Sequence, residues 1–201
     1  MTRIIGGVAR GRRLATPHGD RTRPTSDRVR GALFSSVESW CGSLHDLRFL
    51  DLYAGSGAVG LEAWSRGAAH VTLVEQDRRT AALVAANARD LGCEVAHVVT
   101  ASAMTALSRD PGAPFDVVYA DPPYPLPTPD VVALLERLVG HGWLHDETLV
   151  VVERATRSQP LAWPAGLVGD RERRYGETVL WYGHADLLPD PGEPAGAEER
   201  R

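Results

Sequence analysis

The tetrapeptide Asp121-Pro122-Pro123-Tyr124 is the stretch of this 201-residue chain best equipped to do chemistry. It follows residues 115–120, a mostly apolar, β-prone run that predicts a buried strand. Each proline holds the residue before it in an extended conformation, so the chain after the strand is stiff. A flat group that carries an amine can stack on Tyr124 and donate its two hydrogens to the Asp121 carboxylate and the Pro122 carbonyl. Those hydrogen bonds would aim the amine lone pair at an electrophile; an ordinary proline-rich loop with an N-cap aspartate is the alternative.

A glycine-rich turn, residues 55–60 (Gly-Ser-Gly-Ala-Val-Gly), is the second candidate site. It lies between a predicted strand and a predicted helix, where backbone N–H groups can face a ligand. The pattern fits a dinucleotide fingerprint, with Glu75 as the ribose-binding acid, and so leaves a nicotinamide enzyme open. Asp51 counts against a dinucleotide, because its carboxylate would repel a pyrophosphate but suits a ligand with an ammonium and a sulfonium. A loop-ordering role for Asp51 is the plainer interpretation.

These residues require a framework that brings strand ends together. Strands alternate with helices along the chain, which predicts an α/β fold with a doubly wound, mostly parallel sheet. A C-terminal hairpin is expected to add an antiparallel strand at one edge. The predicted strands are residues 48–54, 71–75, 95–99, 115–120, 148–153, 171–175 and 178–182. A first helix is predicted before these strands, and four further helices between them, at residues 61–66, 78–91, 104–108 and 129–139.

The first helix is expected to start at Pro24, with Thr25 or Ser26 as its N-cap. Arg28 and Arg30 lie off its apolar face. That face is formed by Val29, Leu33, Phe34 and Val37.

Charge is unevenly distributed along the chain. All 22 basic residues are arginines, and residues 1–30 hold eight of them against two aspartates, a net charge of +6. Because the whole chain carries −4, residues 31–201 carry −10. A basic arm on an acidic body indicates a polyanionic partner, although a solvated segment that binds nothing has the same composition. We expect a hairpin arm over 1–23, one domain over 24–185 and a disordered tail over 186–201.

Several classes of protein do not fit this sequence. It has no apolar run of eighteen residues and no signal-peptide pattern, so we expect no membrane span and no export. The two cysteines, Cys41 and Cys93, have no metal-binding or redox spacing, which favours a reducing cytoplasm. His141 and His145 flank a glycine in a predicted loop, so no metal site is expected there.

Taken together, Asp51, the glycine turn, Glu75 and the Asp-Pro-Pro-Tyr corner resemble the class I S-adenosylmethionine-dependent amino-methyltransferases. The resemblance is closer to one group, the RsmD family, whose members methylate the exocyclic N2 of one guanine in 16S rRNA. It runs from about residue 3 to 183 and rests on four motifs in order: residues 3–7 (Arg-Ile-Ile-Gly-Gly), 23–30 (Arg-Pro-Thr-Ser-Asp-Arg-Val-Arg), 51–57 (Asp-Leu-Tyr-Ala-Gly-Ser-Gly) and 60–63 (Gly-Leu-Glu-Ala).

The resemblance implies a seven-stranded Rossmann-like methyltransferase sheet, S-adenosylmethionine as cofactor and 16S rRNA as partner. Because the basic arm is short, we expect the rRNA to be presented in an assembled small subunit. We also expect a monomer, and methyl transfer from an activated sulfonium needs no metal. A DNA adenine-N6 methyltransferase and a non-catalytic rRNA-binding assembly factor are the alternatives.

The implied catalytic residues are Asp121, Pro122, Pro123 and Tyr124. The implied cofactor residues are Asp51, Tyr53, Ala54, Gly55, Gly57, Glu75, Gln76 and Ser102, the last standing where relatives often carry an acid for the adenine amine. The implied RNA contacts are Arg10, Arg12, Arg13, Arg23, Thr25, Asp27, Arg28 and Arg154.

Overall fold

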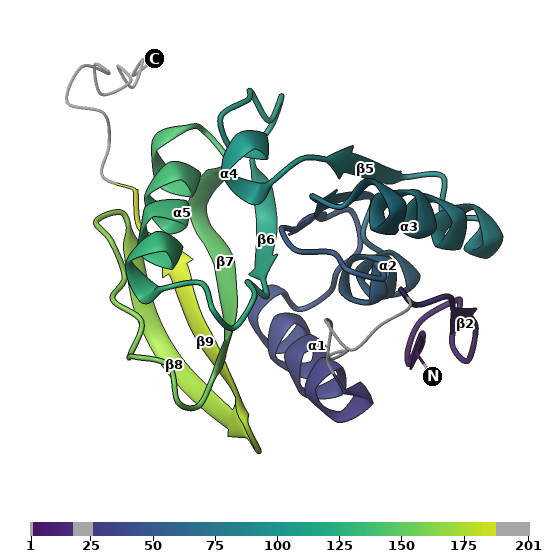
Figure 1. The fold of residues 1–201 in the computed structure, drawn as a ribbon, viewed down its shortest axis with the longest axis horizontal. Helices are drawn as coiled ribbons and strands as arrows, with labels where there is room; N and C mark the ends of the chain where they lie inside the picture. The colour runs from purple at the N-terminus through teal and green to yellow at the C-terminus, as the bar shows by residue number, and fades with distance from the viewer. Residues whose placement is uncertain (1, 18–25, 188–201) are drawn as a thin grey trace, which may run out of the picture.

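A seven-stranded sheet with the strand order β5-β4-β3-β6-β7-β9-β8 forms the frame of the molecule (Figure 1). The structure is a computed structural model, which describes residues 2–17 and 26–187. The strands are β3 (Arg48–Asp51), β4 (His70–Glu75), β5 (Ala96–Thr100), β6 (Phe115–Ala120), β7 (Leu144–Ala155), β8 (Leu167–Tyr175) and β9 (Thr178–Ala185).

The sheet is mostly parallel, as predicted. Strands β3 to β7 pair in parallel, whereas β9 pairs antiparallel with both β7 and β8 at one edge. The chain runs from central β3 outward through β4 to β5, and then returns to β6 on the other side of β3. This reversal creates a crevice at the carboxyl ends of β3 and β6, where open α/β sheets bind ligands.

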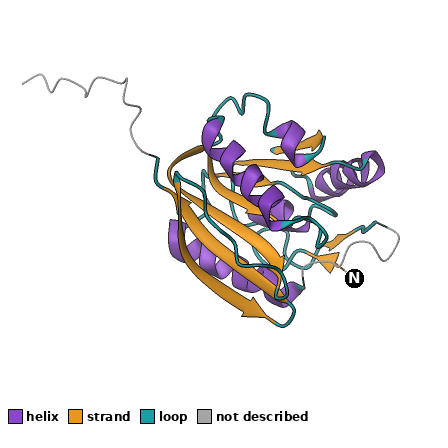
Figure 2. Cartoon of the chain, turned by 60° about the vertical axis from the view of Figure 1, so that its left-hand side comes forward, coloured by secondary structure: helices purple, strands orange, loops and turns teal. Residues whose placement is uncertain are grey.

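Helices cover both faces of the sheet (Figure 2). On one face, α1 (Asp27–Cys41), α2 (Ala58–Ser65) and α3 (Arg78–Leu91) pack on residues such as Phe49, Val71 and Val151. On the other face, α4 (Ala103–Ala106) and α5 (Thr128–Gly140) pack on residues such as Leu50 and Val150. Alternate residues of a strand point to opposite faces, so each buried strand supplies both layers. None of these helices is long and apolar enough to cross a membrane.

The first helix begins at Asp27 and has the predicted Ser26 cap, whereas the predicted start at Pro24 lies outside the described residues. Its buried face departs from the prediction at one residue. The Val29 N–H donates to the Ser26 hydroxyl, which caps the helix, and the predicted apolar face is buried. Arg30 was expected off that face, yet its side chain is fully buried. Its Nη2 donates to the Arg3 carbonyl (2.6 Å) and to Asp27 Oδ1 (2.8 Å), so the N-terminal arm covers it.

The N-terminal arm contains the predicted hairpin, formed by β1 (Thr2–Arg3) and β2 (Arg13–Leu14). It lies against α2 and α3 through buried Ile4, Ala9 and Leu14. Backbone N–H groups of the arm donate to three side chains of those helices, Glu62, Ser65 and Asn87. The arm is therefore docked on the body. Most of the predicted tail, residues 188–201, lies outside the described residues, as do Arg23 and Thr25.

Candidate active site

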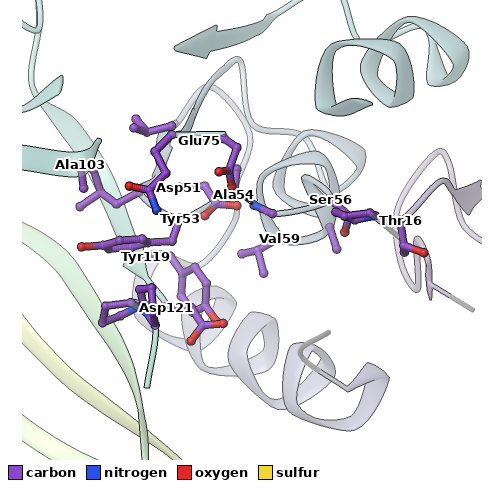
Figure 3. Close-up of a pocket in the computed structure, with 18 of the residues that line it drawn as sticks. Thr16, Asp51, Tyr53, Ala54, Ser56, Val59, Glu75, Ala103, Tyr119 and Asp121 are labelled. Carbon is purple, nitrogen blue, oxygen red and sulfur yellow. Dashed lines mark hydrogen bonds between the residues drawn. The ribbon is translucent and has the colours of Figure 1, made fainter. Parts of the chain in front are cut away.

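A cavity of about 470 Å³ opens at the carboxyl ends of β3, β4 and β6 (Figure 3). Its volume is in the range of small-molecule sites. It brings together both candidate sites of the sequence. The predicted residues that line it are Asp51, Tyr53, Ala54, Gly55, Glu75, Gln76, Asp121, Pro122, Pro123 and Tyr124.

Asp51, the last residue of β3, is buried in the wall of this cavity. The Gly60 N–H donates to its Oδ2 (3.0 Å), while its buried Oδ1 has no hydrogen-bond partner among the described residues. Burial raises the pKa of Asp51 to about 7, against the effect of the backbone N–H groups of Gly60 and Tyr53; the charge of Glu75 raises it further. A buried carboxylate with one oxygen left without a hydrogen-bond donor favours a cationic ligand.

The glycine turn shapes the neighbouring wall. Gly55 and Gly57 have φ angles of 55° and 80°, which favour glycine, and Gly57 is the N-cap of α2. The Gly55 N–H donates to Glu75 Oε2 (3.1 Å), and the Asp77 N–H donates to Glu75 Oε1 (2.8 Å). Two backbone donors thus fix the Glu75 carboxylate at the end of β4, beside the turn.

The Asp-Pro-Pro-Tyr corner follows the end of β6 and forms the mouth of the cavity. The Leu126 N–H donates to the Pro123 carbonyl (2.8 Å), and Arg154 Nη2 donates to the Leu126 carbonyl (2.8 Å). The Tyr124 side chain is 39% exposed, with the Arg157 guanidinium carbon 5.9 Å from its ring centroid. The corner is therefore held from β7 and presents an aromatic ring to incoming groups.

Asp121 lies where negative charge accumulates. Burial holds its pKa well above the usual range, and the carboxylates of Glu153 and Asp51 raise it further, while Arg154 lowers it. Tyr119, two residues earlier in β6, also lines the cavity and donates its hydroxyl hydrogen to Glu153 Oε2 (2.5 Å).

Comparison with known proteins agrees with this architecture. Residues 2–184 match the family described as Conserved hypothetical protein 95. Ribosomal RNA small subunit methyltransferase D of Escherichia coli K12 is 40% identical over 182 residues, which cover 88% of this chain and 86% of that protein. This chain belongs to the RsmD family. The Haemophilus influenzae protein of the same name is 36% identical over 165 residues, covering 81% of this chain and 82% of the relative.

A solved structure also resembles this member of the RsmD family closely. The Escherichia coli protein yhhF superposes with a TM-score of 0.82 and 35% identity, covering 93% of this chain and 99% of that one. The predicted family and fold are both confirmed.

Two residues of this chain that were predicted to bind the cofactor do not line the cavity. Gly57 lies behind its wall, where an added Cβ would be 3.1 Å from Leu61 and Val84 carbons. The Ser102 hydroxyl caps α4, accepting from the Thr105 N–H (3.1 Å) and donating to its hydroxyl (2.8 Å). The neighbours of Ser102, Ala101 and Ala103, line the cavity instead. The proposed contact of Ser102 with a cofactor adenine therefore stays a prediction, and its hydroxyl is engaged within α4.

None of the described residues that were predicted to bind RNA lines the cavity; most of them are exposed, and one is buried. Arg10 and Arg13 are exposed on the arm, and Arg12 Nη2 donates to the Asp90 carbonyl (2.6 Å). Asp27 pairs with Arg3 and Arg30 near the start of α1, where Arg28 is exposed. Arg154 is buried and holds the corner loop.

Sequence reasoning missed several residues around the cavity of this RsmD protein. Thr2, Thr16 and Pro17 of the arm line it, and Figure 3 shows Thr16 beside Ser56. Tyr119 and Glu153 were read only as strand residues. Nothing local in the sequence marks these positions, because each depends on packing between distant segments. Within the described chain, no group of three or more His, Cys, Asp or Glu residues is arranged to hold a metal ion.

Proposed function

We propose that this protein is an S-adenosylmethionine-dependent methyltransferase that modifies the exocyclic N2 amine of a guanine in 16S rRNA. The proposal depends mainly on one observation: the Asp51 carboxylate, whose Oδ1 has no hydrogen-bond partner among the described residues, and the Asp121–Tyr124 corner line the same cavity. The first suits a cationic cofactor and the second suits a flat amine. The names of the two curated relatives support ribosomal RNA as the substrate class.

The cavity residues fit S-adenosylmethionine. Asp51, with its unpaired buried Oδ1, would hold the positively charged methionine end. Glu75, fixed by two backbone N–H groups, would accept hydrogen bonds from the ribose hydroxyls. Val74, Ala101 and Ala103 provide apolar surface for the adenine ring. When bound, this cofactor supplies a methyl group already activated by its positive sulfur.

The corner residues would then align the acceptor. The Asp121 carboxylate and the Pro122 carbonyl accept the two N2 hydrogens, and Tyr124 stacks on the guanine. Such stacking is worth about 1–3 kcal/mol per base, and good alignment of two reactants up to about 7–11 kcal/mol. The guanine has to leave its stack to reach this position. Asp121 orients the amine and need not remove its proton before the new bond forms.

The arm supports an RNA partner. Residues 1–23 would act as a basic RNA-binding arm and 24–185 as the methyltransferase domain. Asp186 and Leu187, at the start of the predicted tail, are hydrogen-bonded to the body through their N–H groups, and the rest of that tail lies outside the described residues. Arg10, Arg12, Arg13, Arg23 and Arg28 would contact phosphates, with Thr25, Asp27 and Arg154 nearer the target. Because the arm is short, an assembled small subunit whose rRNA is already shaped is the preferred substrate. We propose a cytoplasmic monomer.

The decisive experiment transfers labelled methyl from S-adenosylmethionine to unmethylated small ribosomal subunits. Label should appear in 16S rRNA as N2-methylguanine. Asp121→Ala should reduce transfer by at least about 100-fold, because the amine is no longer aligned. The variant should still bind cofactor. Loss of methyl transfer with binding retained would exclude a purely non-catalytic assembly role for the wild type.

Duplex DNA belongs in the same assay, since adenine N6 offers the same two hydrogens to this corner. Transfer to DNA but not to subunits would overturn the proposed substrate and favour an adenine-N6 methyltransferase. Comparable rates on naked 16S rRNA and on subunits would overturn the preference for an assembled particle.

A further inference from the structure

Glu153 is a buried carboxylate that the proposed mechanism does not use. It belongs to β7, is only 3% exposed and does not line the cavity. Its Oε2 accepts a hydrogen bond from the hydroxyl of Tyr119 (2.5 Å), whose side chain does line the cavity (Figure 3). Glu153 thus reaches the site through another residue. Burying a carboxylate is costly, so its presence behind a ligand cavity needs a physical reason.

The sheet register brings Glu153 beside Asp121. Ala120, the last residue of β6, pairs with Val152 of β7, so the next residues, Asp121 and Glu153, stand side by side at the point where β6 ends and β7 continues. Residues two apart in a strand share a face, so Asp121 and Tyr119 project to the same side. Neighbouring carboxylates make each other harder to ionise; burial is the largest cause of the raised Asp121 pKa, and the charge of Glu153 is the next.

We propose that Glu153 is a positioning residue for methyl transfer, which fixes Tyr119 in the cavity wall and sets how strongly the Asp121 carboxylate accepts hydrogen bonds and protons. This inference rests on the proposed function. Glu153 touches neither cofactor nor guanine; it acts on the residue that orients the amine.

The chemistry gives that carboxylate two successive tasks. Before transfer, ionised Asp121 accepts an N–H hydrogen bond and aligns the amine. The N2–carbon bond then forms as the carbon–sulfur bond breaks, and the bonding electron pair stays on sulfur. The positively charged nitrogen that results releases its proton to the Asp121 carboxylate, which passes it to water. A carboxylate made more basic by a neighbouring charge performs both tasks better.

Other charged groups also act on Asp121. Asp51 at the end of β3 makes it harder to ionise, and Arg154 of β7 makes it easier. Glu75 acts on Asp51 from β4. The positive charge of bound cofactor would oppose the effect of the Glu153, Asp51 and Glu75 carboxylates on the ionisation of Asp121. The measurement therefore has to be made with saturating cofactor.

The test is the pH dependence of kcat on small subunits, between about pH 5.5 and 9, for variants at position 153. Glu153→Gln keeps the shape and an acceptor for Tyr119 but removes the charge. Its acidic limb should move to lower pH by about one unit, because Asp121 ionises more readily. Glu153→Asp keeps the charge and should leave the midpoint near that of the wild type. Glu136→Gln, the same change on the exposed face of α5, should leave it unchanged.

Each outcome bears on one claim. A wild type that transfers no methyl to subunits defeats the proposed function. An active wild type whose midpoint is shared by Glu153→Gln defeats the inference and leaves a purely structural role for Glu153. If Glu153→Gln fails to fold, as judged by lost cofactor binding, Glu153→Thr, which also removes the charge, takes its place. A midpoint that moves to lower pH in the Thr variant but not in Glu153→Asp supports the inference, and a midpoint that stays in the Thr variant overturns it.

Discussion

Asp51 shows how one buried residue can couple pH to ligand binding. In the free protein its pKa is raised from 3.8 to about 7, mainly by burial, so it is partly protonated at neutral pH. A cationic ligand stabilises the ionised form and therefore has to displace that proton. Proton release and ligand binding are then linked.

Affinity for S-adenosylmethionine should consequently rise with pH between about 6 and 8. The slope below the pKa is at most tenfold per pH unit, the limit for one linked proton. Calorimetric titrations in buffers of different ionisation enthalpy should detect protons released on binding. Affinity that falls as pH rises over this range would contradict the assignment of Asp51 to the cationic end of the ligand.

Asp51→Asn is the control for that prediction. It should bind the cofactor roughly 10- to 100-fold more weakly at pH 8, and with little pH dependence, because the charge-assisted hydrogen bond is lost. The sign for stability is the opposite. Between about pH 4 and 7 the native protein holds a proton on Asp51 that the unfolded chain does not, so stability falls as pH rises. The Asn variant should lack that fall.

At the scale of elements, α2 lies unusually close to β4, and Gly60 is the residue that permits it. A Cβ at Gly60 would lie 2.7 Å from Leu73 Cδ2 and 3.1 Å from Val71 Cγ1, and both side chains are fully buried. The same close approach brings the Gly60 N–H to the Asp51 carboxylate. The packing of α2 and the position of the Asp51 carboxylate in the cavity wall therefore both depend on the absence of a side chain at Gly60.

Gly60→Ala should lower the free energy of unfolding by up to about 2 kcal/mol, because overpacking costs about 1–3 kcal/mol and the higher helix propensity of alanine offsets about 1 kcal/mol of that cost. Urea unfolding gives the comparison. The matched control is Gly140→Ala at the end of α5, where an added Cβ meets nothing within 4 Å, so stability should be unchanged or slightly higher. A Gly60→Ala protein as stable as the control would show that α2 can move away from β4 freely.

Features set by neighbouring residues were predictable from the sequence, and contacts between distant segments were not. Helix α3 has its predicted bounds, because the Asp77 cap and Gly92 mark them locally. Asp51 and Asp121 were expected to converge, because both end strands of a parallel sheet. The burial of Arg30 and the Tyr119–Glu153 hydrogen bond depend on partners 27 and 34 residues away, which no local pattern records.

At the scale of the whole molecule, the docked arm joins the basic surface to the cavity. Asn87 of α3 donates to the carbonyls of Ala15 in the arm and Ser56 in the glycine turn, both at 2.9 Å. Thr16 and Pro17 then form part of the cavity wall. Phosphates held on the arm would therefore lie at a fixed position relative to the glycine turn, and this arrangement would let a short arm orient a large substrate.

The arm should consequently dominate the salt dependence of RNA binding. Replacing exposed Arg10 and Arg13 by glutamine should lower the slope of log affinity against log salt by about 1.4–1.8, since each lost phosphate contact removes about 0.7–0.9. Filter binding of rRNA over a salt series measures this slope. Glutamine at Arg109 and Arg137, near α4 and α5, removes the same charge elsewhere. If both pairs of substitutions lowered the slope equally, RNA would be attracted by net charge alone. A slope lowered only by the arm pair would mean that phosphates lie on the hairpin, beside the cavity proposed to receive the target base.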